Sequence, residues 1–232
     1  MEQHYKIAGL RVAMDSFGRT DDFSRPYMID WEGQPDFVIQ ADWSKWERMH
    51  PGCAEQMYEY MATGENFYTQ LLNFDGMMIH SSSVIMDGRA YLFSAPCGTG
   101  KSTHVCLWRR VFGDERVRVL NDDKPALRLE DGVWYAYGTP WSGKTGQNLN
   151  LRAPLAGICI IERGETNEIT PFTGPQMVKM ILSQTTELNN PVLRLKQLDL
   201  LDKLLTQVPV WKLKCNMDPE AARISHAAMS AK

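Results

Sequence analysis

A glycine-rich loop between a strand-like segment and a helical pattern constrains this chain most. Residues 95–102 read APCGTGKS and fit the phosphate-loop pattern GxxxxGKS/T, with Ala in place of the first Gly. Residues 89–95 before the loop read as the returning strand of a hairpin, and residues 101–112 after it carry apolar side chains at helical spacing. In this context, successive backbone N–H groups can wrap a phosphate at the positive end of the helix. The sequence therefore predicts a nucleotide-binding α/β protein.

Each position of the loop has a part in this prediction. Gly98 and Gly100 supply positive φ angles and close backbone approach. Lys101 reaches the β- and γ-phosphates of ATP, and the Ser102 hydroxyl is a ligand of Mg²⁺. The predicted nucleotide site consists of Cys97, Gly98, Thr99, Gly100, Lys101, Ser102 and Thr103. The alternative is a glycine-rich turn that precedes Lys-Ser by chance, and the flanking strand and helix disfavour it.

Two adjacent carboxylates follow the next predicted strand. Residues 117–120 read as a short buried strand, and Asn121, Asp122 and Asp123 come directly after it. One carboxylate can hold Mg²⁺ together with Ser102, while the other accepts a proton from an attacking hydroxyl. Because adjacent carboxylates repel each other, we expect one of the pair to have a raised pKa. The sequence does not decide between Asp122 and Asp123 as the base, and a solvated Asp-Asp turn is the alternative.

A second loop is a candidate for contact with the acceptor or the γ-phosphate. Residues 138–144 read GTPWSGK and follow the predicted strand at 133–137. We expect Trp141 to be exposed there, beside two hydroxyls and Lys144, which can stabilise the charge of the transferring phosphoryl group. The alternative is a surface turn with Trp141 as its apolar anchor.

Three further polar residues are weaker candidates on their own. His80 precedes three serines on the strand before the Asp87-Gly88 hairpin, and alone it fits an ordinary core or edge histidine. Arg152 and Arg163 are candidates for phosphate contact, against the reading of each as a surface or ion-pair arginine.

Residues 71–232 carry the pattern of an α/β core. Strands are predicted at residues 77–86, 89–95, 117–120, 126–130, 133–137, 155–162 and 210–215, the sixth being central in the sheet. Asp87-Gly88 and Asp131-Gly132 are two-residue hairpin signals. Helices are predicted at residues 101–112, after Pro175, at 195–208 and after Asp218. We expect a P-loop core with a mixed, partly antiparallel sheet flanked by helices.

Residues 1–70 are predicted to form a small β-rich N-terminal region. Residues 5–14 alternate like one half-buried strand, and residues 36–39 form a second. Residues 54–62 predict a helix that ends at Thr63-Gly64, before a separate apolar segment at 67–74.

Composition excludes several classes of protein. The 232 residues include 25 Lys and Arg against 28 Asp and Glu, a net charge of -3 that does not indicate nucleic-acid binding. The longest apolar run, 153–161, contains Pro and Gly and is far shorter than the ~20 residues that cross a bilayer. The N-terminus lacks a secretory signal, so we expect a cytoplasmic protein with no nucleic-acid or membrane partner. The five cysteines form no CxxC pair, which argues against disulfides and zinc.

The order of these motifs resembles a known catalytic core. His80-Ser-Ser, then CGTGKST at 97–103, then LNDD at 120–123 is similar to the core shared by HPr kinase/phosphorylase and ATP-dependent phosphoenolpyruvate carboxykinase. In both groups a histidine precedes the glycine-rich loop and an acidic pair follows it. The resemblance spans residues 76–124, and the layout looks closest to small stand-alone relatives of HPr kinase, which include kinases acting on serine hydroxyls of modified peptides or on free serine.

The resemblance implies roles for individual residues. Lys101 and Ser102 would bind phosphate and Mg²⁺, Asp122 or Asp123 would be metal ligand and catalytic base, and His80 would lie beside the base or a second metal. At 232 residues the sequence is too short to hold the large substrate lobe of the carboxykinases, and the C-terminal signature of HPr kinase is not evident. The HPr kinase relatives also imply a homo-oligomer.

The leading hypothesis is a kinase that uses ATP and Mg²⁺. It would transfer the γ-phosphate to a serine-type hydroxyl of a peptide, protein or small molecule. An alternative is a non-catalytic ATP-binding or sensing accessory protein of a peptide-modification pathway, and a weaker one is a carboxykinase-like enzyme. The sequence does not identify the acceptor.

Overall fold

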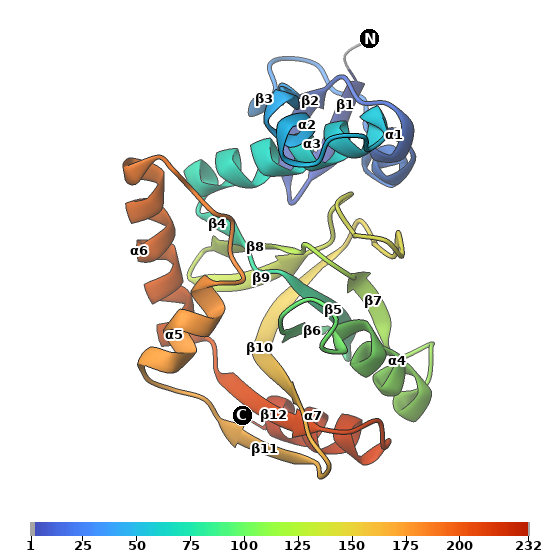
Figure 1. Cartoon of the computed structure of the whole chain (residues 1–232), viewed down its shortest axis with the longest axis vertical. Coiled ribbons are helices and arrows are strands. Elements are labelled where there is room, and N and C mark those ends of the chain that lie inside the picture. The colour runs from blue at the N-terminus through green and yellow to red at the C-terminus, as the bar shows by residue number, and fades with distance from the viewer. Residues whose placement is uncertain (1–2, 232) are drawn as a thin grey trace.

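Two β-sheets organise residues 3–231, the part of the chain that the computed structural model describes (Figure 1). The smaller sheet contains β1 (Gln3–Ile7), β2 (Leu10–Met14) and β3 (Phe37–Ile39) in that order. The larger sheet contains β4 (Gly76–Met78), β5 (Ser81–Met86), β6 (Arg89–Ser94), β7 (Arg118–Asn121), β8 (Ala126–Glu130), β9 (Val133–Tyr137), β10 (Arg152–Arg163), β11 (Glu168–Pro171) and β12 (Val210–Cys215). Its strand order is β4-β8-β9-β10-β6-β5-β7, with β12 also paired to β10 and β11 paired to β12.

Seven α-helices lie among the described residues. They are α1 (Gly18–Ser24), α2 (Ser44–Met49), α3 (Glu55–Leu71), α4 (Lys101–Phe112), α5 (Pro175–Leu182), α6 (Pro191–Gln207) and α7 (Glu220–Ser230). Side chains of α5 and α6 pack into one core of the larger sheet, and those of α4 and α7 pack into another. The α3 helix lies between the two sheets (Figure 1). None of the helices within residues 3–231 has both the length and the apolar character needed to cross a bilayer.

The central strand β10 shows why the sheet is mixed and covered on both faces. It pairs in parallel with β6 and β12 and antiparallel with β9. Because successive strand residues point to opposite faces, Ile158 and Ile160 enter the core of α5 and α6, whereas Cys159 and Ile161 enter that of α4 and α7. The predicted α/β class, with a mixed sheet between helices and a small N-terminal sheet, is confirmed.

The hairpins of the core are where the sequence places them. Asp87-Gly88 joins β5 to β6, and Asp131-Gly132 joins β8 to β9, with positive φ at all four residues. The predicted strand at 77–86 is wrong in one respect, because it divides into β4, which pairs with β8, and β5, which pairs with β6 and β7. The strand β11 was not predicted.

The N-terminal region departs more from the expectation. Residues 5–14 form two strands rather than one, because Ala8 and Gly9 adopt positive φ and reverse the chain. Ala-Gly is not among the favoured dipeptides of such turns, so the alternating pattern hides it. The short helices α1 and α2 were also not predicted. The third hydrophobic core crosses the predicted boundary between residues 70 and 71, since it joins the small sheet and α3 to β4, β8 and β9.

The predicted helix end at Thr63-Gly64 is wrong, because α3 continues to Leu71. Gly64 lies inside the helix against the indole of Trp141, and a Cβ at this position would come within 2.8 Å of Trp141 Cδ1. The glycine therefore serves close packing with a distant residue, not the end of the helix.

Replacing Gly64 with Ala is expected to destabilise the fold by up to about 2 kcal/mol, because overpacking costs up to ~3 kcal/mol and exceeds the ~1 kcal/mol gained in helix propensity. Urea unfolding followed by tryptophan fluorescence measures the change in midpoint at constant slope. The control is the same substitution in a Trp141→Leu background, where it is expected to stabilise. Stabilisation by Gly64→Ala in the unaltered protein would contradict the crowding.

Candidate functional site

The phosphate loop joins the end of β6 to the start of α4, as predicted. Gly98 has a φ of 77° and Gly100 a φ of 125°, and a Cβ at either position would meet nothing within 4 Å. Backbone conformation, not crowding, therefore requires glycine at both positions. The helix begins at Lys101, with His104 N donating to Gly100 O at 2.9 Å. The arrangement leaves backbone N–H groups at a helix N-terminus, where they can bind an anion.

Lys101 and Ser102 occupy the first turn of α4. Lys101 is 8% exposed, and its Nζ donates to the carbonyl oxygen of Ala95 at 3.0 Å. Burial lowers the pKa of Lys101 below its ordinary value, and the nearby Cys97, Asp123 and Asp122 act in the opposite direction. Ser102 and Thr103 are exposed. A buried ammonium beside two carboxylates and a loop of N–H groups is chemically suited to phosphate.

The Asp122 carboxylate faces the start of α4. Its Oδ1 accepts a hydrogen bond from Ser82 Oγ at 2.6 Å, and its Oδ2 accepts one from Thr145 Oγ1 at 2.9 Å. Ser82 Oγ is also 3.5 Å from Ser102 Oγ. The hydroxyl and the carboxylate predicted to hold Mg²⁺ thus flank one buried serine.

The donor set fits Mg²⁺. No group of three or more His, Cys, Asp or Glu side chains that could hold a metal occurs within residues 3–231. Mg²⁺ does not require such a cage, because it is usually bound through one or two carboxylates together with phosphates and water. Ser102 and Asp122 could therefore hold it beside the loop.

The Asp123 carboxylate has a different set of partners. Its Oδ1 lies 3.0 Å from His80 Nε2, and its Oδ2 lies 3.9 Å from Lys124 Nζ. Asn121 sets this geometry, because its Oδ1 accepts from the backbone N–H groups of Asp123 and Lys124 at 2.9 and 2.7 Å. The turn gives the adjacent aspartates different partners, which sequence alone could not separate.

The expected raised pKa is not found at Asp123. Burial opposes ionisation of this carboxyl, but the hydrogen bond from His80 and the charges of Lys124 and Lys101 hold its pKa below the ordinary value of 3.8. The repulsion between adjacent carboxylates does not dominate, because each has its own donors. Asp123 is therefore ionised near neutral pH and can accept both a hydrogen bond and a proton.

The 183–189 segment positions His80. His80 N donates to Gln184 O at 2.7 Å, and His80 Nδ1 lies 3.3 Å from Gln184 Oε1. Ser94, the last residue of β6, donates through its hydroxyl to His80 O at 2.7 Å. The imidazole is thereby fixed between β6, the 183–189 segment and Asp123. His80, Asp123, Asp122, Lys101 and Ser102 come together at one end of the sheet.

The 138–144 loop meets only part of its prediction. Trp141 is fully buried, stacked on Phe67 with ring centroids 4.7 Å apart, so the expectation of an exposed indole is wrong. The hydroxyl residues Thr139 and Ser142 are also buried. The indole anchors the loop because it packs on Gly64 and Phe67 of α3. The sequence around Trp141 gives no sign of this contact with a distant helix.

The end of this loop lies against Asp123. A Cβ on Gly143 would come within 2.8 Å of Asp123 Cβ, and Gly143 N donates to Tyr60 Oη at 3.0 Å. Lys144 is exposed and lines a surface pocket of about 480 Å³ with Arg19 and other residues. Its predicted contact with the transferring phosphoryl group remains a prediction.

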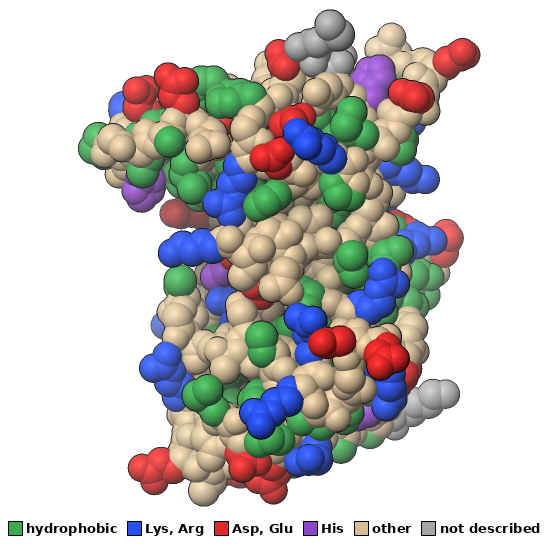
Figure 2. Space-filling view, turned by 90° about the vertical axis from the view of Figure 1, so that its right-hand side faces the viewer, with side chains coloured by type: hydrophobic (Ala, Val, Ile, Leu, Met, Phe, Trp, Pro, Cys, Tyr) green, Lys and Arg blue, Asp and Glu red, His purple; other side chains and the backbone are tan. Residues whose placement is uncertain are grey.

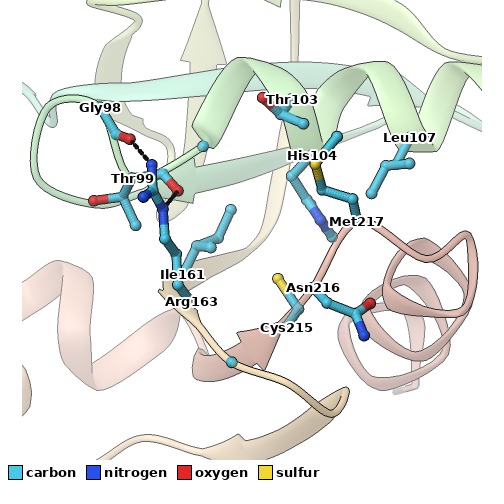
Figure 3. Close-up of a pocket in the computed structure, with 12 residues that line it drawn as sticks. Gly98, Thr99, Thr103, His104, Leu107, Ile161, Arg163, Cys215, Asn216 and Met217 are labelled. Carbon is cyan, nitrogen blue, oxygen red and sulfur yellow. Dashed lines mark hydrogen bonds between the residues drawn. The ribbon is translucent and has the colours of Figure 1, made fainter.

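A pocket of about 500 Å³ lies beside the phosphate loop (Figure 3). It is lined by the loop, by α4 and by the ends of β10 and β12, and the residues drawn include Thr99, His104, Arg163, Asn216 and Met217. Arg163 Nε donates to Thr99 O at 3.2 Å, and Arg163 Nη2 donates to Gly98 O at 2.5 Å. In a trans peptide the C=O and N–H point in opposite directions, so Arg163 also fixes the N–H groups that follow these carbonyls.

Arg163→Ala is expected to weaken Mg·ADP binding by about 3- to 20-fold, the usual worth of one or two exposed hydrogen bonds from a charged group. Calorimetric titration measures the Kd. The matched control is Arg152→Ala at the other end of β10, where the guanidinium pairs with Glu130 and donates to Tyr137 Oη at 2.8 Å. Equal losses in both variants would show that Arg163 does not act through the loop.

Comparisons with known proteins identify no family. No protein-family model matches this chain, and no curated protein matches its sequence. Among solved structures, the HPr(Ser) kinase/phosphatase from Coxiella burnetii aligns with 66% of this chain and 99% of its own length, at a TM-score of 0.38 and 9% identity. This likeness is weak. The fold class stated above rests on the sheets and helices themselves.

The structure adds polar residues to the site that the sequence did not single out. Thr145 donates a hydrogen bond to Asp122, and Gln184 contacts His80, whereas Asn121, already part of the predicted triplet, orients Asp123 and Lys124. Thr145 and Gln184 belong to separate segments with no motif of their own. Ser82 could have been found, since it lies in the serine run after His80.

Proposed function

We propose that this protein is a kinase that uses ATP and Mg²⁺ to phosphorylate a hydroxyl group. One observation carries the proposal: a phosphate loop with a buried lysine lies beside two carboxylates that face different partners. Asp122 faces Ser82 and Ser102, and Asp123 is hydrogen-bonded to His80. A group for phosphate, a group for metal and a group for a proton thus meet at one place.

The nucleotide would occupy the loop and the neighbouring pocket. Backbone N–H groups at 98–101 and Lys101 Nζ bind the phosphates, and the pocket of about 500 Å³ beside Arg163 takes the nucleoside. Mg²⁺, held by Ser102 and Asp122, would neutralise charge on the β- and γ-phosphates.

The chemical step then needs one group that takes up the proton of the attacking hydroxyl. The acceptor hydroxyl oxygen bonds to the γ-phosphorus while the bond from that phosphorus to the β,γ-bridging oxygen breaks, and ADP leaves with the electron pair. The hydroxyl proton passes to Asp123 Oδ, which is ionised at neutral pH. His80 is a positioning residue here, because its hydrogen bond orients the carboxylate.

The experiment follows the labelled phosphate. The protein is incubated with Mg²⁺ and ATP labelled on the γ-phosphate, together with fractions of a cell extract, and the products are treated with acid. Label on a compound or peptide that survives both this acid and neutral hydroxylamine supports a hydroxyl kinase, since phosphohistidine is acid-labile and acyl phosphates are cleaved by hydroxylamine. Label found only as inorganic phosphate indicates hydrolysis, and bound but unconverted ATP favours a nucleotide-sensing protein.

Lys and Arg side chains are interspersed with Asp and Glu on the face shown in Figure 2. The absence of a nucleic-acid or membrane partner, the cytoplasmic location and a homo-oligomer remain predictions.

A further inference from the structure

A second cavity, of about 470 Å³, lies between the N-terminal region and the larger sheet. Its walls come from α2, α3, β4 and the 185–189 segment. It is distinct from the pocket beside the phosphate loop, with which it shares no lining residue. Its volume lies in the range of about 300–1,000 Å³ that is usual for small-ligand sites.

Two structural links connect this cavity to the pair of His80 and Asp123. Lys124 lines the cavity, and its Nζ lies 3.9 Å from Asp123 Oδ2. Residues of the 185–189 segment also line the cavity, and this segment follows Gln184, which contacts His80 through both its backbone and its side chain. Lys124 and the segment after Gln184 thus connect the candidate base to the wall of this cavity.

The charges along α2 and α3 within the cavity are largely balanced. Glu65 forms an ion pair with Lys45 and accepts a hydrogen bond from Trp46 Nε1 at 3.0 Å. Lys124 Nζ lies farther from its partner Asp123, at 3.9 Å. A weakly paired cation therefore marks the end of the cavity next to the base.

The walls on α2, α3 and β4 are rich in methionine and aromatic groups, whereas the 185–189 segment contributes the polar residues Thr185, Thr186, Glu187 and Asn189. Met49, Met61 and Met78 line the cavity together with the ring of Tyr68. Methionine side chains are flexible and polarizable, so a wall of them accommodates apolar groups of different shape. The methionine side of the cavity therefore suits an apolar group beside the hydroxyl.

We propose that this cavity is the acceptor site and takes a hydroxyl compound with an apolar group next to the hydroxyl. This inference rests on the proposed kinase function. The apolar group lies against Met49, Met61 and Met78, and the hydroxyl lies near Lys124 and Asp123, opposite the γ-phosphate. A serine next to an apolar residue in a peptide and an acylated free serine share this chemistry.

The test compares acceptors that differ only beside the hydroxyl. Blocked pentapeptides with one Ser carry Leu, Gly or Asp next to it, and N-hexanoylserine and N-acetylserine form the small-molecule arm. ADP release with Mg·ATP gives kcat and KM for each. We expect kcat/KM to be about 10- to 100-fold higher with Leu than with Asp, as for an apolar pocket. A higher kcat/KM in the peptide arm identifies a peptide acceptor, and a higher value in the small-molecule arm identifies an acylated serine.

Variants with a matched control locate the effect. Met61 and Met57 are one turn apart on α3, and only Met61 lines this cavity, while Met57 lines the pocket with Lys144. Met61→Gln is expected to raise KM for the Leu peptide by about 5- to 20-fold with a smaller change in kcat, and Met57→Gln to behave like the unaltered protein. Met49→Gln serves as a second variant that cannot unfold the core, since Met49 is 56% exposed.

Each outcome decides a separate question. Similar kcat/KM for all neighbours, or equal effects of Met61→Gln and Met57→Gln, overturns the acceptor site. Lys101-dependent binding of Mg·ADP without transfer to any of these probes also overturns it, while leaving the nucleotide site intact. Failure of the protein to bind Mg·ADP contradicts the proposed function itself.

Discussion

Replacement of Asp123 with Asn is expected to lower kcat for phosphoryl transfer by about 10²- to 10⁴-fold, the usual contribution of a positioned general base. Asn has nearly the same size and can still contact His80 Nε2, which lies 3.0 Å from the carboxylate. The amide oxygen cannot take up the proton of the acceptor hydroxyl. ADP release at saturating Mg·ATP and acceptor measures kcat.

Two further variants give this result its meaning. The control is Asp114→Asn, at an exposed carboxylate that pairs with Arg109 at 2.6 Å on the surface. Asp122→Asn tests the metal role, and we expect added Mg²⁺ to recover part of its activity but none of that of Asp123→Asn. Full phosphoryl transfer by Asp123→Asn would show that the assignment of the base is wrong.

The depressed pKa of Asp123 sets the direction of the pH dependence. The pKa of the Asp123 carboxyl lies below 3.8, so this group becomes protonated only when the pH falls below its ordinary range. Asp123 therefore imposes no loss of activity between about pH 5 and 8. Any decline of kcat in that range has to come from another group.

The second large effect is expected at Lys101. Lys101→Ala should weaken binding of Mg·ADP by about 10- to 100-fold, because it removes a charge-assisted contact to phosphate. The ammonium is already desolvated and held by Ala95 O, so the side chain is positioned for its ligand before nucleotide binds. Calorimetric titration gives the Kd, and the rise in Tm with added nucleotide is a second measurement.

The control for Lys101 lies on the same helix. Arg110 is exposed on α4, and Arg110→Ala is expected to bind Mg·ADP as the unaltered protein does. Unchanged affinity in Lys101→Ala, with the fold intact by circular dichroism, would mean that the glycine-rich loop does not bind nucleotide through this lysine.

Local sequence patterns were sufficient for the core of the fold. The Asp-Gly hairpins, the α4 helix and the central strand depend on residues close in sequence, and each is present. The errors at Gly64 and Trp141 have a single cause. Each residue explains the other, because the indole fills the space that a helix side chain would occupy. No local rule connects positions so far apart in the chain.

For the candidate site as well, local motifs were sufficient for some residues, whereas other features depend on distant contacts. Lys101, Asp122 and Asp123 follow from the loop and the acidic pair, which are short motifs. The difference between the two aspartates depends on Thr145 and His80, which come from separate segments, as well as on the adjacent Lys124. The sequence could therefore name the chemical groups but not assign their roles.

The packing of Trp141 on α3 bears on how such a protein could be altered. Its indole Nε1 donates to Thr63 Oγ1 at 3.2 Å, and two residues later Gly143 lies against Asp123. If the N-terminal region is exchanged to change acceptor preference, α3 has to be exchanged with it. Otherwise the contacts of the Trp141 indole with Thr63 and Gly64 have to be rebuilt. In the proposed kinase, acceptor choice and alignment of the base would both depend on one helix.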